Sequence, residues 1–174
     1  MVDACQVLLG LKKRGFGVDL YNGFGGKPDT GEDMVDCARR ELEEESGLRV
    51  SREGLSDMGK VIIARPLGSG QNALAICIHL FACTQWTGTV VETDEMRPAW
   101  FSFNEDMPWG DMWPEARLFL PQLLSSIRVL PRPTMKAYIE YHLVSAQPYD
   151  SWRQLTRTNA QGHFEALAGW KIHF

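Results

Sequence analysis

The sequence contains few cysteines, and their spacing excludes the common metal-binding and disulfide frameworks. The four are Cys5, Cys37, Cys77 and Cys83, and no two of them have CxxC spacing. Small secreted domains are usually dense in disulfides, so this pattern favours reduced thiols in an intracellular protein. We therefore expect a cytoplasmic location, with the nucleus and the mitochondrion as alternatives.

Long hydrophobic runs and a strong excess of charge are absent as well. No apolar run approaches the roughly 20 residues of a membrane-spanning helix, and the first residues lack the basic region and cleavage site of a signal peptide. The formal net charge of −4 argues against a basic surface for a nucleic-acid polymer but leaves nucleotides open as ligands. We expect neither a membrane nor a nucleic-acid partner.

The composition is that of an ordinary globular protein. Of the 174 residues, 44% are hydrophobic and 23% are charged, and there is no repeat or low-complexity segment. This length predicts one domain, residues 1–174, with enough chain for a real core. We expect a monomer in which residues 131–174 form C-terminal strands.

One segment, 26–48, predicts an acidic helix whose charges lie at the wrong end of the helix dipole. Asp29 and Glu32 have the spacing of a capping box, and Gly47 is a suitable residue to end the helix. Glutamates fill the last turns, where the dipole repels carboxylates. Three of them fall on one narrow arc beside the apolar face, namely Glu41, Glu44 and Glu45. Such an arc needs a cation, and Mg²⁺, with Mn²⁺ as an alternative, fits that need beside phosphates.

The spacing of this segment is more specific than its charge. Its fixed positions are Gly26, Glu32, Arg40, Glu41, Leu42, Glu44, Glu45, Gly47 and Leu48, which match the Nudix box in full. The alternative is a solvated amphipathic helix with a run of glutamates, which does not account for so many fixed positions. The chain is therefore similar to the Nudix hydrolases.

Four further stretches resemble one branch of that superfamily, the animal oxidised-purine nucleoside triphosphate hydrolases of MutT type. They are 7–17, 22–27, 94–98 and 111–114. The resemblance implies an α+β fold in which a mixed β-sheet is sandwiched between helices (α/β/α). The branch has a strand ahead of Val7, and only six residues precede Val7 here. We expect that strand to be missing or its place to be filled by another segment.

Short apolar runs and, at 72–83 and 136–144, apolar alternation predict strands along the chain. The expected strands are 5–11, 58–64, 72–83, 94–103, 136–144 and 163–174. A second helix is expected at 112–124, with an interruption at Pro121.

The resemblance also implies a metal site and a reaction. The ligands that it implies are the Gly26 carbonyl, Glu41, Glu44, Glu45 and Glu95. Arg40 is expected to form an ion pair with Glu44, four residues on, and to orient the catalytic glutamates, while Glu32 supports the site. Water attacks a phosphorus of the triphosphate, and one of Glu41, Glu44 or Glu95 takes the proton. The sequence leaves open which one.

Substrate recognition is implied at residues outside the box. These are Lys12, Phe16, Asn22, Trp113, Glu115 and Phe119. Asn22 is expected to hydrogen-bond the base, and Phe16 and Trp113 to pack or stack on it. Lys12 begins a basic loop that is expected to meet the triphosphate, although a solvated turn is an equal alternative. Ordinary core packing is the alternative for Trp113 and Phe119.

Two positions depart from the branch. It carries a pair of aspartates after the Trp-Pro dipeptide, where this chain has Glu115 and Ala116. Ala116 can neither donate nor accept a hydrogen bond. A site that loses one of two hydrogen-bonding groups is expected to discriminate less strongly for the oxidised base.

The predicted function is Mg²⁺-dependent hydrolysis of oxidised purine nucleoside triphosphates, such as 8-oxo-dGTP and 2-hydroxy-dATP. The products are the nucleoside monophosphate and pyrophosphate, and the role is to cleanse the nucleotide pool. One alternative is the same chemistry on another nucleotide, which Ala116 favours. Another is a nucleotide-binding protein with little turnover, which the missing strand favours.

Overall fold

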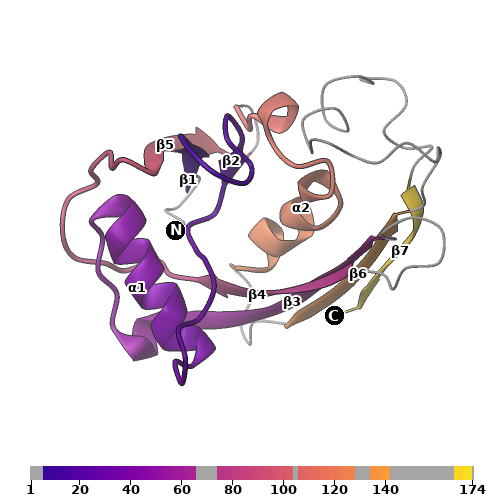
Figure 1. Cartoon of the computed structure of the whole chain (residues 1–174), viewed down its shortest axis with the longest axis horizontal. Helices are drawn as coiled ribbons and strands as arrows, with labels where there is room; N and C mark the ends of the chain where they lie inside the picture. Colours follow the sequence, from indigo (N-terminus) through magenta and orange to yellow (C-terminus); the bar gives the residue numbers. More distant parts are fainter. Residues whose placement is uncertain (1–5, 66–73, 104–105, 128–133, 142–166, 174) are drawn as a thin grey trace. The chain divides into compact units, whose positions relative to one another are not determined.

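A computed structural model describes residues 6–65, 74–103, 106–127, 134–141 and 167–173 (Figure 1). They divide into two compact units. The first comprises the described residues of Met1–Asp57 and Phe81–Trp113, and the second those of Met58–Leu80 and Pro114–Phe174. Each unit is described by itself, and the prediction of a single domain stays a prediction.

The first unit is built on a three-stranded antiparallel sheet. Its strands are β1 (Gln6–Lys12), β2 (Tyr21–Asn22) and β5 (Met96–Ser102), in the order β2-β1-β5. The register places Lys12 opposite Met96 and Gly10 opposite Asn22. The end of β1 therefore lies beside Glu95, which immediately precedes β5.

One helix and two short 3-10 turns complete this unit. They are α1 (Met34–Ser46), η1 (Arg52–Gly54) and η2 (Trp109–Asp111). The buried core joins Leu8 of β1 to Leu42 of α1 and to Leu48, Val50 and Cys83, with Trp86 and Trp100 packed against it. Leu42 lies next to Glu41 in the chain, so this core fixes α1 by the side that borders its glutamates.

The caps of α1 correct one prediction and confirm another. Asp33 is the N-cap, and its carboxylate accepts the N–H groups of Val35 and Asp36, each at 2.9 Å. The predicted cap at Asp29 was wrong, because residues 29–32 form a separate turn before the helix. Gly47 ends the helix as expected, with φ 75°.

The second unit contains a four-stranded mixed sheet in the order β4-β3-β6-β7. Its strands are β3 (Ser56–Arg65), β4 (Leu74–Ala82), β6 (Met135–Tyr141) and β7 (Leu167–His173); the ends of β3 and β4 are counted with the first unit. β3 pairs in parallel with β6, and β6 pairs antiparallel with β7. Gly59 of β3 lies directly against the backbone of Met135 in β6. An added Cβ at Gly59 would be 2.6 Å from the Met135 carbonyl carbon.

Helix α2 (Ala116–Ser126) also belongs to this unit and continues through Pro121. The predicted interruption was wrong, because burial of Leu120, Leu123 and Leu124 keeps both halves helical. The α+β class is confirmed by mixed strand pairing and α-helices. The predicted strands are found, with bounds shifted by a few residues. The expectation of a missing first strand concerns residues 1–5, which lie outside the described residues.

No helix in the described part of the chain has the length and apolar character needed to cross a bilayer.

Candidate active site

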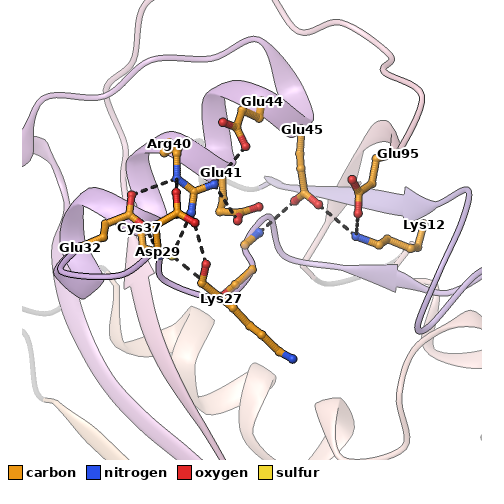
Figure 2. Close-up of polar contacts among 12 residues, drawn as sticks. Lys12, Lys27, Asp29, Glu32, Cys37, Arg40, Glu41, Glu44, Glu45 and Glu95 are labelled. Atoms are coloured by element: carbon orange, nitrogen blue, oxygen red, sulfur yellow. Dashed lines mark hydrogen bonds and ion pairs between the residues drawn. The ribbon is translucent and has the colours of Figure 1, made fainter.

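The glutamates of α1 are organised by Arg40. Its Nη1 donates to Glu41 at 2.9 Å and to Glu44 at 3.0 Å. Its Nε and Nη2 donate to the two carboxylate oxygens of Glu32, each at 2.9 Å. A guanidinium holds its donors in a rigid fork, so one side chain fixes three carboxylates (Figure 2). The predicted ion pair with Glu44 is confirmed.

Glu32 anchors the other side of this fork. Its hydrogen bonds to Arg40 and to the Asp29 N–H lower its pKa to about 2. The hydrogen bonds to Glu32 and Glu41 in turn raise the pKa of Arg40. Arg40 also donates to the Lys27 carbonyl at 3.3 Å, which ties the segment before the helix to α1. Glu32 and Arg40 therefore both stay charged at the pH at which the protein is expected to work.

Gly26 forms the floor under Glu41. A Cβ built on Gly26 would lie 2.6 Å from the Glu41 carboxyl carbon, closer than any real contact. The Cys37 thiol of α1 lies 3.9 Å from the Gly26 carbonyl and donates to it. The missing side chain thus lets the Glu41 carboxylate pack directly against the backbone at Gly26.

Glu45 lies on the other side of the acidic arc and is buried. Only 3% of it is exposed, and its carboxylate accepts the Gly25 N–H at 2.9 Å and the Lys12 ammonium at 3.1 Å. Burial raises the pKa of Glu45, and the hydrogen bonds from Gly25 and Lys12 oppose that shift only in part. The charged form of Glu45 therefore depends on nearby donors and cations such as Lys12.

Lys12 joins Glu45 to Glu95. Its Nζ also lies 2.5 Å from the Glu95 carboxylate, and Figure 2 shows both carboxylates pointing at this one ammonium. Burial lowers the pKa of Lys12, but the hydrogen bonds and charges of Glu95 and Glu45 outweigh it, so the pKa is raised. The same hydrogen bond from Lys12 lowers the pKa of Glu95.

The donor set is chemically suited to a hard divalent cation. It consists of carboxylates and one carbonyl oxygen, the ligands that Mg²⁺ prefers. The Lys12 ammonium forms ion pairs with both Glu45 and Glu95. These two carboxylates therefore lie close enough together to share one positive charge. Within the described residues no three acidic, histidine or cysteine side chains are already arranged around one metal position. In this arrangement Arg40 and Lys12 neutralise these carboxylates instead.

The aromatic residues predicted to meet the base lie at a turn of the same unit. The rings of Phe16 and Trp113 are stacked, with centroids 5.1 Å apart and planes at 23°. Asn22 lies at the end of β2, and its Nδ2 donates to the Leu20 carbonyl at 3.3 Å. These three predicted residues belong to the first unit.

The other two predicted base-pocket residues belong to the second unit. Glu115 is 4% exposed and directly precedes α2, and Phe119 is half-buried within that helix. Their position relative to Trp113 stays a prediction.

Sequence reasoning missed how Lys12 is paired, because it placed Lys12 either against the triphosphate or in a solvated turn. One signal was available, because antiparallel pairing of the segments around residues 12 and 96 brings Lys12 next to Glu95. The contact with Glu45 had no such signal, because the two residues are 33 positions apart and meet only through packing.

Comparison with known proteins identifies the family. The family model described as the NUDIX domain matches residues 4–123. The chain belongs to this family. The resemblance predicted from the Nudix box is therefore confirmed.

Two curated Nudix relatives are similar over most of the chain. Both are named oxidized purine nucleoside triphosphate hydrolase. The protein of Danio rerio is 42% identical over 130 residues, covering 75% of this chain and 79% of its own. That of Mus musculus is 43% identical over 119 residues, covering 68% and 72%.

Solved structures share the Nudix fold. A MutT protein from Bacillus halodurans superposes with a TM-score of 0.67 at 18% identity, covering 98% of this chain and 92% of its own. A MutT NUDIX hydrolase from Burkholderia pseudomallei gives 0.53 at 21% identity, covering 72% and 90%. At such low identity these matches speak for the fold alone, and they confirm the predicted Nudix fold.

Proposed function

We propose that this Nudix protein hydrolyses oxidised purine nucleoside triphosphates to the nucleoside monophosphate and pyrophosphate. The observation that carries the proposal is the acidic edge of α1, where Arg40 holds the carboxylates of Glu41 and Glu44 side by side. The substrate class is supported by the names of relatives that are 42% and 43% identical.

The proposed cofactor is Mg²⁺, with Mn²⁺ as an alternative. Its ligands are the Gly26 carbonyl, Glu41, Glu44, Glu45 and Glu95. When bound, the metal neutralises charge on the phosphate oxygens and lowers the pKa of a water molecule. The chain supplies the rest: Arg40 orients Glu41 and Glu44, and the Gly25 N–H orients Glu45.

Proton transfer is proposed to involve Glu41, Glu44 or Glu95. Among them Glu95 has its pKa lowered by Lys12, which makes it a weaker proton acceptor while that contact persists. Glu44 is the most exposed, with 57% of its side chain accessible, and has the freest access to water. The direct test is the pH profile of Glu44→Gln, in which loss of the acidic limb of kcat supports Glu44 as the base.

Base recognition is proposed for Asn22, Phe16 and Trp113, and phosphate contact for Lys12. The stacked pair Phe16–Trp113 supports an aromatic platform. Glu115 and Phe119, which belong to the second unit, are proposed as further substrate-binding residues. Ala116 favours a second candidate, the same chemistry on an unmodified nucleotide, because it removes a hydrogen-bonding group from the position where the branch has an aspartate.

The test is hydrolysis of a panel with Mg²⁺, followed as pyrophosphate release from 8-oxo-dGTP, 2-hydroxy-dATP, O6-methyl-dGTP and dGTP, and as AMP release from ADP-ribose. The proposal expects an oxidised purine triphosphate to have the highest kcat/KM and EDTA to abolish release. Faster turnover of dGTP than of every modified purine would replace it with the second candidate. Tight nucleotide binding with no release from any compound would leave a binding protein.

A monomeric state and a cytoplasmic location complete the proposal. Light scattering at assay concentration tests the first, and fractionation of cells that express the full chain tests the second.

A further inference from the structure

The turn that carries Phe16 has an unusual backbone. Residues 13–20 connect β1 to β2, and three of them adopt left-handed φ values: Gly15 at 74°, Gly17 at 79° and Asp19 at 65°. The Leu20 N–H donates to the Gly17 carbonyl at 3.1 Å, which closes the turn on Gly17. Such a backbone is costly for most residues, and it persists only where the surrounding contacts hold it.

Gly17 lies directly against the indole of Trp113. A Cβ built on Gly17 would be 3.1 Å from Cζ2, 3.4 Å from Nε1 and 3.5 Å from Cε2 of that ring. Phe16 stacks on the same indole. The ring therefore rests on the bare backbone at Gly17, with Phe16 beside it.

The backbone of Trp113 is held by the same hairpin. Its neighbour Met112 forms a parallel β-bridge with Tyr21 of β2 and is 5% exposed. The Tyr21 ring makes an edge contact with Phe101 of β5, with centroids 4.8 Å apart. β2 thus fixes the residue before Trp113, while the turn ahead of β2 fixes the ring.

We propose that Gly17 is a positioning residue for the nucleobase. Because it has no side chain, the Trp113 indole can settle on the turn, and this contact sets the plane on which a base stacks. The proposal rests on the proposed function for the identity of the ligand. A methyl group at Gly17 would displace the ring by a few tenths of an ångström and leave the acidic edge of α1 untouched.

The chain offers a matched control. Gly15 has nearly the same φ as Gly17, and a Cβ built on it meets nothing within 4 Å. Gly15→Ala and Gly17→Ala therefore both place a side chain at a left-handed φ, and only Gly17→Ala adds a methyl group against the indole. Their difference isolates the contact with Trp113.

The kinetic test compares both variants on the best substrate of the panel. Gly17→Ala is expected to raise KM about tenfold relative to Gly15→Ala, with kcat changed less than about twofold. Inhibition by inorganic tripolyphosphate, which has no base, should be the same in both. In a Trp113→Ala background Gly17→Ala and Gly15→Ala should give the same KM, because the contact that distinguishes them is gone. Equal KM values for the two alanine variants would overturn the proposal.

A spectroscopic test needs no turnover. The indole N–H resonance of Trp113, assigned by its loss in Trp113→Phe, should shift in Gly17→Ala and stay in place in Gly15→Ala. Titration with 8-oxo-dGMP, followed on that resonance in the wild type and both alanine variants, gives the Kd values. We expect a Kd about tenfold higher in Gly17→Ala than in Gly15→Ala.

The two proposals can fail separately. If the wild type binds 8-oxo-dGMP but hydrolyses no nucleotide, the proposed function fails. The Kd values of Gly17→Ala and Gly15→Ala still test whether Gly17 positions the base. The opposite case is a wild type that hydrolyses the panel while its Trp113 resonance does not shift when nucleotide is added, or does not shift in Gly17→Ala. The proposed role of Gly17 is then wrong, and the proposed function stands.

Discussion

The acidic edge of α1 and the aromatic turn at Phe16 and Trp113 are positioned in different ways. Glu41, Glu44 and Arg40 lie within five consecutive residues of one helix, so helical geometry alone puts them on one side. Phe16 and Trp113 are 97 positions apart and meet only because a strand bridge and a left-handed turn bring them together. The first arrangement should survive small changes elsewhere in the fold. The second depends on how distant segments of the fold pack together.

This difference predicts how each region responds to substitution. The acidic edge should be sensitive to charge and to the geometry of a single fork, with effects on kcat. The aromatic turn should be sensitive to sub-ångström packing, with effects on KM. The tests below are ordered from the largest expected effect to the smallest.

The largest effect is expected for Glu45→Gln. Glutamine keeps the size of the side chain and an acceptor for the Gly25 N–H, but it removes the buried charge. We expect kcat to fall at least about 100-fold with the circular dichroism spectrum unchanged. Glu43→Gln is the control, because Glu43 lies on the same turn but pairs with Arg49 at the surface. Unchanged activity of Glu45→Gln would contradict its assignment as a ligand.

Arg40→Lys should come next. Lysine keeps the charge but cannot hold Glu32, Glu41 and Glu44 with one rigid fork. We expect activity or Mg²⁺ affinity to fall about 10- to 100-fold, measured by initial rates across a Mg²⁺ titration. The neighbouring Arg39→Lys is the control, since Arg39 bonds only Asp36 and the Val50 carbonyl among the contacts described here. Equal losses in the two variants would show that a general helix effect is responsible.

Trp113→Ala tests the aromatic side of the comparison. Loss of a stacking surface is expected to raise KM about 5- to 100-fold with little change in kcat. Trp109→Ala serves as the control, because Trp109 is half-buried in η2 of the same unit. A fall in kcat with KM unchanged would move Trp113 from base recognition to the chemistry.

The N-cap of α1 tests whether local sequence or tertiary structure decides where the helix begins. Asp33→Ala removes the acceptor for the Val35 and Asp36 N–H groups and should lower the melting temperature by about 2–4 °C. Asp29→Ala should lower it by less than about 1 °C, because the Asp29 side chain is 80% exposed. A larger fall in melting temperature for Asp29→Ala than for Asp33→Ala, measured by differential scanning calorimetry, would support Asp29 as the N-cap.

The smallest effect concerns pH. The pKa of Glu32 is about 2 in the folded protein, below its ordinary value of 4.5, because of Arg40 and the Asp29 N–H. Its ion pair therefore stabilises the fold fully above pH 4.5, and that stability is lost as the pH falls towards 2. Glu32→Gln should flatten the acid limb of urea-unfolding stability and leave the alkaline limb unchanged. An unaltered acid limb would assign the acid sensitivity to other carboxylates.

Several parts of the fold and site could be predicted because their signals are local. Gly47 ends α1 since a left-handed residue there needs no side chain, and Arg40 meets Glu44 because four residues make about one helical turn. The Asp29 cap failed because Asp33, four residues on, offers the same chemistry and also pairs with Arg52. The ion pair with Arg52 of η1 favours Asp33, and it forms only when η1 packs near the start of α1.

Sequence by itself determined the family, the α+β class and the acidic helix, because each depends on spacing within short segments. Tertiary structure decided what those carboxylates face. Lys12 reaches Glu45, 33 positions on, only through packing, and the Trp113 indole rests on Gly17 through the close approach of two distant segments. Contacts of this kind depend on how packed segments fill space, and no spacing along the chain encodes them.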